Sequence, residues 1–194
     1  MIEHPDINTY RQAIAACAAL EGTFKGRLFR SCTAKYATEK DLLTGDGSFK
    51  FGGRWNAPNR FRVVYLSLSL EGSLAESIGA TTSYGIDPTQ CLPLTSVVLD
   101  ADLNRTLDLT LPAIRKLLGI SLASMNGCDW ELDNRANREA MTQAVGRAAC
   151  EAGLQGIVVP SVCKRTFRHL NVFPQNLTSV KQQLQIINAG NLPK

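Results

Sequence analysis

One short stretch of this chain gathers residue types that could bind and cleave a phosphate-bearing substrate. Two adjacent glycines, Gly52 and Gly53, stand directly before Arg54. Glycine permits positive φ and close approach of the backbone to a ligand, and arginine presents a planar fork of donors that suits phosphate oxygens. Tyr65 and Glu76 follow further along the chain. This order predicts a phosphate-bearing substrate held by arginine, with a carboxylate at the reacting centre.

Each of these side chains also has an ordinary structural explanation. Arg54 could stack on Trp55, which follows it directly, and Tyr65 could simply pack within a sheet. Glu76 ends the sequence Ser73-Leu74-Ala75-Glu76, which fits a capping box in which the glutamate closes the first turn of a helix. The functional interpretation instead places Glu76 beside a sugar carbon that gains positive charge.

Two residues outside that stretch could complete the site. Arg30 ends a short predicted strand and could form a surface ion pair with Asp41 or Asp46, or it could clamp a pyrophosphate together with Arg54. Ser161 follows Pro160 and could cap a turn or hydrogen-bond a phosphate or ribose. His169 is interpreted as structural or exposed, because no hydrolase motif accompanies it.

The bulk composition is that of an ordinary globular protein. The chain has 194 residues, 44% of them hydrophobic and 20% charged, which suits a single domain over residues 1–194. No apolar run approaches the roughly 18 to 20 residues needed to span a bilayer, and no signal peptide is recognisable. We therefore expect a cytoplasmic protein that does not bind a membrane.

Metal and nucleic-acid binding are not predicted. The six cysteines form no C-x-x-C pair, so zinc spacing is absent and free thiols in a reducing compartment are expected. The net charge of +4 is modest. A basic cluster at Lys164–His169 could touch an anion or a partner, but no nucleic-acid-binding motif accompanies it.

The chain alternates between helical and strand-like patterns without a regular βαβ rhythm, which predicts an α+β fold. Helices are expected at about residues 6–20, 73–80, 110–119 and 134–151, and strands at about 26–30, 63–69, 95–100, 156–159 and 171–174. Residues 37–53 are glycine-rich and are expected to form a loop, and 179–187 a last strand or short helix. Alternation in the 63–69 strand places Tyr65 on its more polar face.

The order of these residues resembles the RES domain family, named for its Arg, Glu and Ser. The resemblance covers about residues 26–180 and leaves residues 1–25 as an N-terminal helical extension. Its most specific parts are the Gly-Gly-Arg-Trp-Asn block and the eleven-residue step from Tyr65 to Glu76. The matching residues are Arg30, Arg54, Tyr65, Glu76, Ser161 and Asn171, the last in a strand motif that closes the family's pattern.

This resemblance implies a fold similar to ADP-ribosyltransferase toxins, with central mixed or antiparallel sheets flanked by helices. It implies NAD⁺ as substrate and no prosthetic group or metal. Arg30 and Arg54 would hold the pyrophosphate, Tyr65 would pack on nicotinamide or ribose, Glu76 would act at the ribose, and Ser161 would hydrogen-bond within the pocket. The remaining residues expected to contact the substrate are Gly52, Gly53, Trp55 and Asn56.

Three activities stay open at this point. The first is cleavage of the nicotinamide–ribose bond by water or phosphate, as the toxin of a bacterial toxin–antitoxin pair. The second is ADP-ribosyl transfer to a protein, and the third is a non-catalytic module that binds a nucleotide or a protein. The resemblance also suggests an Xre-type antitoxin and a homodimer as partners to be tested.

Overall fold

A mixed six-stranded sheet organises the computed structural model, which describes residues 1–83, 85 and 87–188. The strands follow the order β1-β2-β5-β4-β3-β6, and all neighbours are antiparallel except the parallel pair β3 and β4. Because β1 also pairs with β3, five of the strands close into a ring. Their bounds are β1 Gly22–Thr33, β2 Val64–Ser67, β3 Leu94–Asp108, β4 Gly156–Pro160, β5 Arg168–Val172 and β6 Leu184–Ile186.

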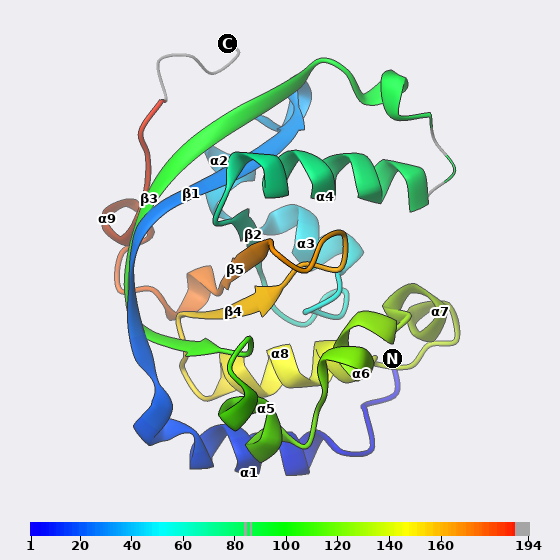
Figure 1. The fold of residues 1–194 in the computed structure, drawn as a ribbon, viewed down its shortest axis with the longest axis vertical. Helices are drawn as coiled ribbons and strands as arrows, with labels where there is room; N and C mark the ends of the chain where they lie inside the picture. The colour runs from blue at the N-terminus through cyan, green and yellow to red at the C-terminus, as the bar shows by residue number, and fades with distance from the viewer. Residues whose placement is uncertain (84, 86, 189–194) are drawn as a thin grey trace.

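The two longest strands form a twisted ribbon along one side of the molecule (Figure 1). β1 and β3 pair from Gly22 with Thr106 to Thr33 with Leu94. Side chains alternate across a strand, so Leu28 and Leu99 turn inward and are fully buried. They join one hydrophobic cluster with Val64 and other residues of the sheet.

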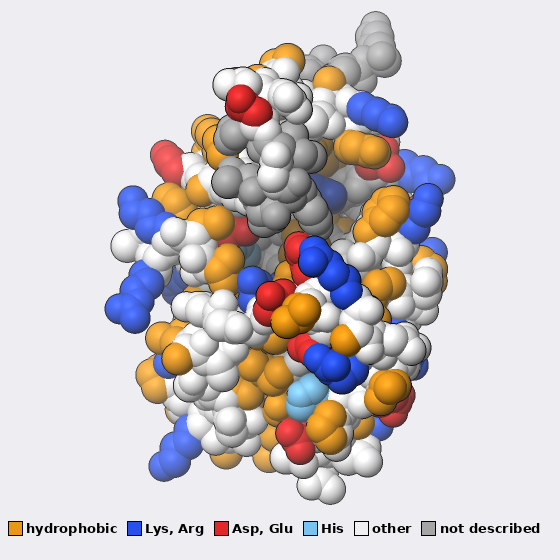
Figure 2. All heavy atoms as spheres, turned by 90° about the vertical axis from the view of Figure 1, so that its right-hand side faces the viewer, with side chains coloured by type: hydrophobic (Ala, Val, Ile, Leu, Met, Phe, Trp, Pro, Cys, Tyr) orange, Lys and Arg blue, Asp and Glu red, His pale blue; other side chains and the backbone are white. Residues whose placement is uncertain are grey.

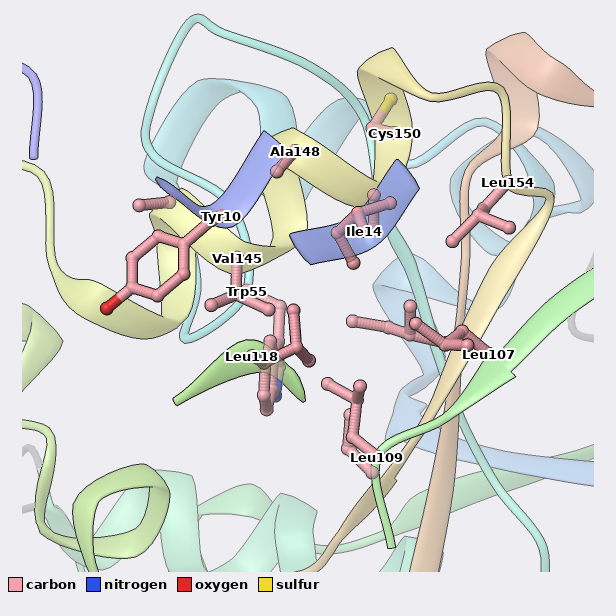
Figure 3. Close-up of a cluster of buried hydrophobic side chains, with 14 of the residues drawn as sticks. Tyr10, Ile14, Trp55, Leu107, Leu109, Leu118, Val145, Ala148, Cys150 and Leu154 are labelled. Atoms are coloured by element: carbon pink, nitrogen blue, oxygen red, sulfur yellow. The ribbon is translucent and has the colours of Figure 1, made fainter. Parts of the chain in front are cut away.

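A second hydrophobic core lies on the other face of the sheet, beneath α1, α5 and α8 (Figure 3). Tyr10 and Ile14 of α1 recur at helical spacing and pack against this core, which also contains Trp55. The helices are α1 Ile7–Ala16, α2 Glu39–Leu43, α3 Asp46–Phe51, α4 Leu70–Ser83, α5 Pro112–Leu118, α6 Leu122–Gly127, α7 Trp130–Arg135, α8 Met141–Glu151 and α9 Val180–Gln183. Short 3₁₀ turns occupy residues 18–20, 34–36, 88–91 and 174–176.

The predicted α+β class and its helix-flanked mixed sheet are confirmed. Several element boundaries were wrong. The strands predicted at 26–30 and 95–100 extend to 22–33 and 94–108, because each supplies the other's backbone partners along most of its length. The predicted loop at 37–53 contains α2 and α3, and residues 179–187 form both a short helix, α9, and a strand, β6.

The helix predicted over 134–151 is interrupted. α7 ends at Arg135, and Asn137 adopts a left-handed backbone with φ of 56° before α8 begins at Met141. The interruption places Glu139 in the interior, where its Oε2 lies 2.7 Å from Nη2 of Arg147. The backbone N–H of His4 donates to the same carboxylate oxygen, so this ion pair also holds the N-terminal segment.

Candidate active site

The structure brings the predicted side chains together around one cavity of about 300 Å³. Arg30 from β1, Tyr65 from β2, Glu76 from α4 and Arg54 from the turn before β2 all line it. A neighbouring cavity of about 660 Å³ shares Arg54, Tyr65 and Glu76 with the first. Figure 2 shows the face on which α7 lies, where acidic, basic and hydrophobic side chains surround a recess. The two cavities, which share these three residues, together make up the candidate site.

Glu76 is held by polar contacts from two other segments. The Ser161 hydroxyl, buried at the end of β4, donates to its Oε1 at 2.7 Å. Nε2 of His169 on β5 lies 2.9 Å from the same oxygen. Burial alone would raise the pKa of Glu76, but the contacts with His169 and Ser161 outweigh it and lower that pKa. Glu76 is therefore an ionised carboxylate in a fixed position.

The capping-box explanation of Glu76 is wrong, because α4 begins at Leu70 rather than at Ser73. Ser73 lies inside the helix, and its hydroxyl donates to Oγ of Ser31 on β1. Gly72 allows this close packing, since a Cβ there would meet Oγ of Ser67 at 2.5 Å. The helix thus lies tightly against the sheet and directs Glu76 into the cavity.

Tyr65 is fixed by the turn that contains the glycine pair. Its hydroxyl donates to Oδ1 of Asn56 at 2.7 Å and accepts from the backbone N–H of Trp55 at 3.0 Å. Gly53 is needed because a Cβ would meet the Tyr65 hydroxyl at 2.5 Å, and Gly52 has a φ of 75°. Burial raises the pKa of Tyr65, so the ring carries a neutral hydroxyl.

The other predicted contact residues take different places. Gly52 and Gly53 line the larger cavity, and Trp55 lines the smaller one while packing into the core. Asn56 is fully buried, and its amide nitrogen donates to backbone carbonyls of Ser48 and Phe61. The structure therefore places Asn56 behind Tyr65, as a support for its hydroxyl.

Both arginines keep their charge available for an anion. Nη1 of Arg54 donates to the carbonyls of Met125 and Cys128, and Nη1 of Arg30 donates to those of Asp41 and Leu42. Neither guanidinium forms an ion pair with a carboxylate among the described residues, so the surface ion pair considered for Arg30 is not seen. Two buried or half-buried cations without a counter-ion favour an anionic ligand.

Two further polar side chains of the site, His169 and Asn171, were not assigned a role from the sequence. Both lie on β5, two positions apart, and both line the smaller cavity. His169 was expected to be structural or exposed, but it is largely buried and contacts Glu76. The alternation of polar His169 and Asn171 with apolar Leu170 and Val172 was the available signal for a strand with one polar face.

Comparisons with known proteins identify the family of this chain. A family model described as the RES domain matches residues 27–192. The chain belongs to the RES domain family. Two relatives, both named NAD(+) phosphorylase MbcT, come from Mycobacterium tuberculosis (strain ATCC 25618 / H37Rv) and Mycobacterium bovis. Each is 30% identical over 133 residues, which is 68% of this chain and 67% of the relative.

A solved structure extends the likeness of this RES domain to nearly the whole fold. The crystal structure of the M. tuberculosis MbcT–MbcA toxin–antitoxin complex matches with a TM-score of 0.70 and 27% identity. The match covers 92% of this chain and 88% of the solved chain. The fold implied by the sequence resemblance is thereby confirmed.

The described residues contain neither a membrane-spanning helix nor a cluster of metal ligands. No helix in that part of the RES domain has the length and apolar character to cross a membrane. No group of three or more His, Cys, Asp or Glu side chains there could hold a metal ion. Five cysteines in the described residues are free thiols, and the side chain of Cys91 lies outside them.

Proposed function

We propose that this RES domain degrades NAD⁺ by breaking the bond between nicotinamide and ribose, with inorganic phosphate as the acceptor. The observation that carries the proposal is the meeting of two unpaired arginines and one ionised glutamate at a single cavity. The relatives named NAD(+) phosphorylase support phosphate as the acceptor.

The substrate's charge distribution fits the arginines. NAD⁺ carries a pyrophosphate between its two nucleosides, and the free donors of Arg30 and Arg54 suit its oxygens. The smaller cavity would take the nicotinamide riboside half, and the larger one offers room for the remainder. Anchoring the pyrophosphate away from the reacting bond uses binding energy to hold the ribose in a reactive pose.

The carboxylate acts at the ribose. As the bond from C1′ to the pyridine nitrogen breaks, its electron pair leaves with nicotinamide and positive charge develops on the ribose. Glu76 would stabilise that charge, and the stabilisation would be strong because the bound substrate excludes water from the site. A phosphate oxygen then forms a bond to this same anomeric carbon, so the products are nicotinamide and ADP-ribose 1″-phosphate. Ser161 and His169 keep the carboxylate in place, and Tyr65 packs beside the sugar or ring.

The test is product analysis with purified protein, NAD⁺, and phosphate either present or absent. Phosphate-dependent nicotinamide release with a phosphorylated ADP-ribose, identified by mass spectrometry, is the expected result. Release of free ADP-ribose without phosphate would make the enzyme a hydrolase instead. ADP-ribose attached to a protein in a lysate would identify a transferase, and binding of NAD⁺ without release would leave only a binding module.

The same site suggests that this chain is a toxin that acts by depleting the cell of NAD⁺. The structural relative was solved as a toxin–antitoxin complex, which supports an antitoxin partner for this chain as well. Induced expression in a bacterium should lower cellular NAD⁺ and stop growth, whereas Glu76→Gln should do neither. Growth arrest by the Glu76→Gln variant would separate toxicity from NAD⁺ cleavage. The homodimer stays a prediction, to be checked by light scattering.

A further inference from the structure

The Asn171 side chain stands out in the smaller cavity, because its amide has no hydrogen-bonding partner in the described part of the chain. The residue is 1% exposed, and neither Nδ2 nor Oδ1 makes a hydrogen bond within the described residues. A buried amide normally has both groups satisfied, since an unmade hydrogen bond in the interior costs free energy. An amide left open at the wall of a binding cavity is poised for a ligand that both donates and accepts.

The surroundings of Asn171 define the shape of that ligand. Asn171 is paired in register with Tyr65 on β2, and Phe29 and Val159 line the same cavity. An aromatic ring, an apolar side chain and an open amide together suit a flat ring that carries one polar substituent.

The position relative to Glu76 fits one particular ring. Asn171 and His169 lie on the same face of β5, about 7 Å apart along the strand, and Nε2 of His169 lies 2.9 Å from Oε1 of Glu76. The amide therefore lies further along the strand than the residue that contacts the carboxylate. In nicotinamide riboside the pyridine ring carries the carboxamide away from the glycosidic bond, so a ribose held at Glu76 can direct the carboxamide toward Asn171.

We infer that Asn171 recognises the carboxamide of the nicotinamide ring and selects amidated over deamidated dinucleotides. Asn171 Nδ2 donates to the carboxamide oxygen, and the carboxamide NH₂ donates to Asn171 Oδ1. Nicotinic acid offers a carboxylate, which can accept from Nδ2 but cannot donate to Oδ1, so the buried Oδ1 stays without a donor and faces a charged oxygen. The inference rests on the proposed function and names the group that sets its substrate specificity.

The experiment is a titration of ¹⁵N-labelled protein with nicotinamide and, separately, with nicotinic acid. The side-chain NH₂ signals of Asn171 are assigned by their loss in Asn171→Leu. We expect nicotinamide to shift these signals and nicotinic acid to leave them in place. In Asn171→Leu the affinity for nicotinamide should fall about 10- to 100-fold, the effect of losing two hydrogen bonds. Asn104→Leu, the same change at an exposed position of β3, should not alter it.

A second ligand separates this inference from the proposed function. ADP-ribose lacks nicotinamide, so its affinity should be the same in wild type and Asn171→Leu. If ADP-ribose binds but nicotinamide does not move the Asn171 signals, the carboxamide assignment is overturned while the NAD⁺ site stands. Failure of both ligands to bind would overturn both proposals. Equal turnover of NAD⁺ and nicotinic acid adenine dinucleotide by wild type would likewise overturn the selectivity.

Discussion

Glu76→Gln tests the central role assigned to the carboxylate. The substitution removes the charge and keeps the size, and the amide oxygen can still accept from the Ser161 hydroxyl. A carboxylate about 4 Å from a full positive charge contributes about 4 kcal/mol at an effective dielectric constant of about 20. Losing that contribution in the transition state predicts a fall in kcat of about 10³-fold. The pyrophosphate contacts are untouched, so NAD⁺ affinity should change by less than about 3-fold.

Chromatography measures the rate of nicotinamide release and so gives kcat, and calorimetry gives the affinity for NAD⁺. Glu71→Gln is the matched control, because Glu71 lies on the same helix, is exposed and lines neither cavity. It should retain the wild-type rate. More than a tenth of the wild-type turnover in Glu76→Gln would refute the electrostatic role. A large loss of NAD⁺ affinity would instead show that Glu76 contributes to binding of the substrate rather than to stabilisation of the transition state.

Three further changes probe pyrophosphate binding, the support of Glu76 and the buried ion pair of α8. Arg54→Ala should raise the Kd for NAD⁺ about 10- to 100-fold by removing charged hydrogen bonds to the pyrophosphate, and calorimetry with unchanged affinity would contradict this. Ser161→Ala removes a donor that favours the ionised form of Glu76, so the pKa of Glu76 rises. Because activity is lost as pH falls through that pKa, the acidic limb of kcat/KM should move to higher pH, whereas Ser161→Thr should keep the wild-type profile. Arg147→Met leaves the buried Glu139 carboxylate without its guanidinium and should lower the free energy of unfolding by about 3 to 5 kcal/mol, measured in urea. The double variant with Glu139→Leu should recover most of that loss, and an equally unstable double variant would argue against the buried-charge explanation.

The features of the site that could be predicted are those that depend only on residues adjacent in the sequence. The glycine pair before Arg54 predicted a special backbone, and Gly52 has φ of 75°. Alternation predicted that Tyr65 would lie on the polar face of its strand, and it lines the cavity there. These predictions needed only neighbours along the chain, because φ preference and strand alternation are local properties.

The helix that carries Glu76 shows where local reasoning failed. Ser73-Leu74-Ala75-Glu76 has the pattern of a capping box, but α4 starts at Leu70, and the helix packs on β1 through Ser73 and on β2 through Gly72. Tertiary packing overrode the local capping signal. Contacts between α4 and the neighbouring strands, rather than the local sequence, therefore determined that Glu76 faces the cavity instead of capping the helix.

By itself, the sequence determined the kinds of chemical group available, their order, the family to which they belong, and the α+β class. Only the tertiary structure decided that Ser161 and His169 hold Glu76. It also decided that, among the residues it describes, the two arginines lack carboxylate partners and the Asn171 amide lacks hydrogen-bonding partners. The reason is separation along the chain: Glu76 and Ser161 are 85 residues apart, yet their oxygens lie at 2.7 Å. Contacts of that kind arise from strand pairing and helix packing, which no local pattern specifies.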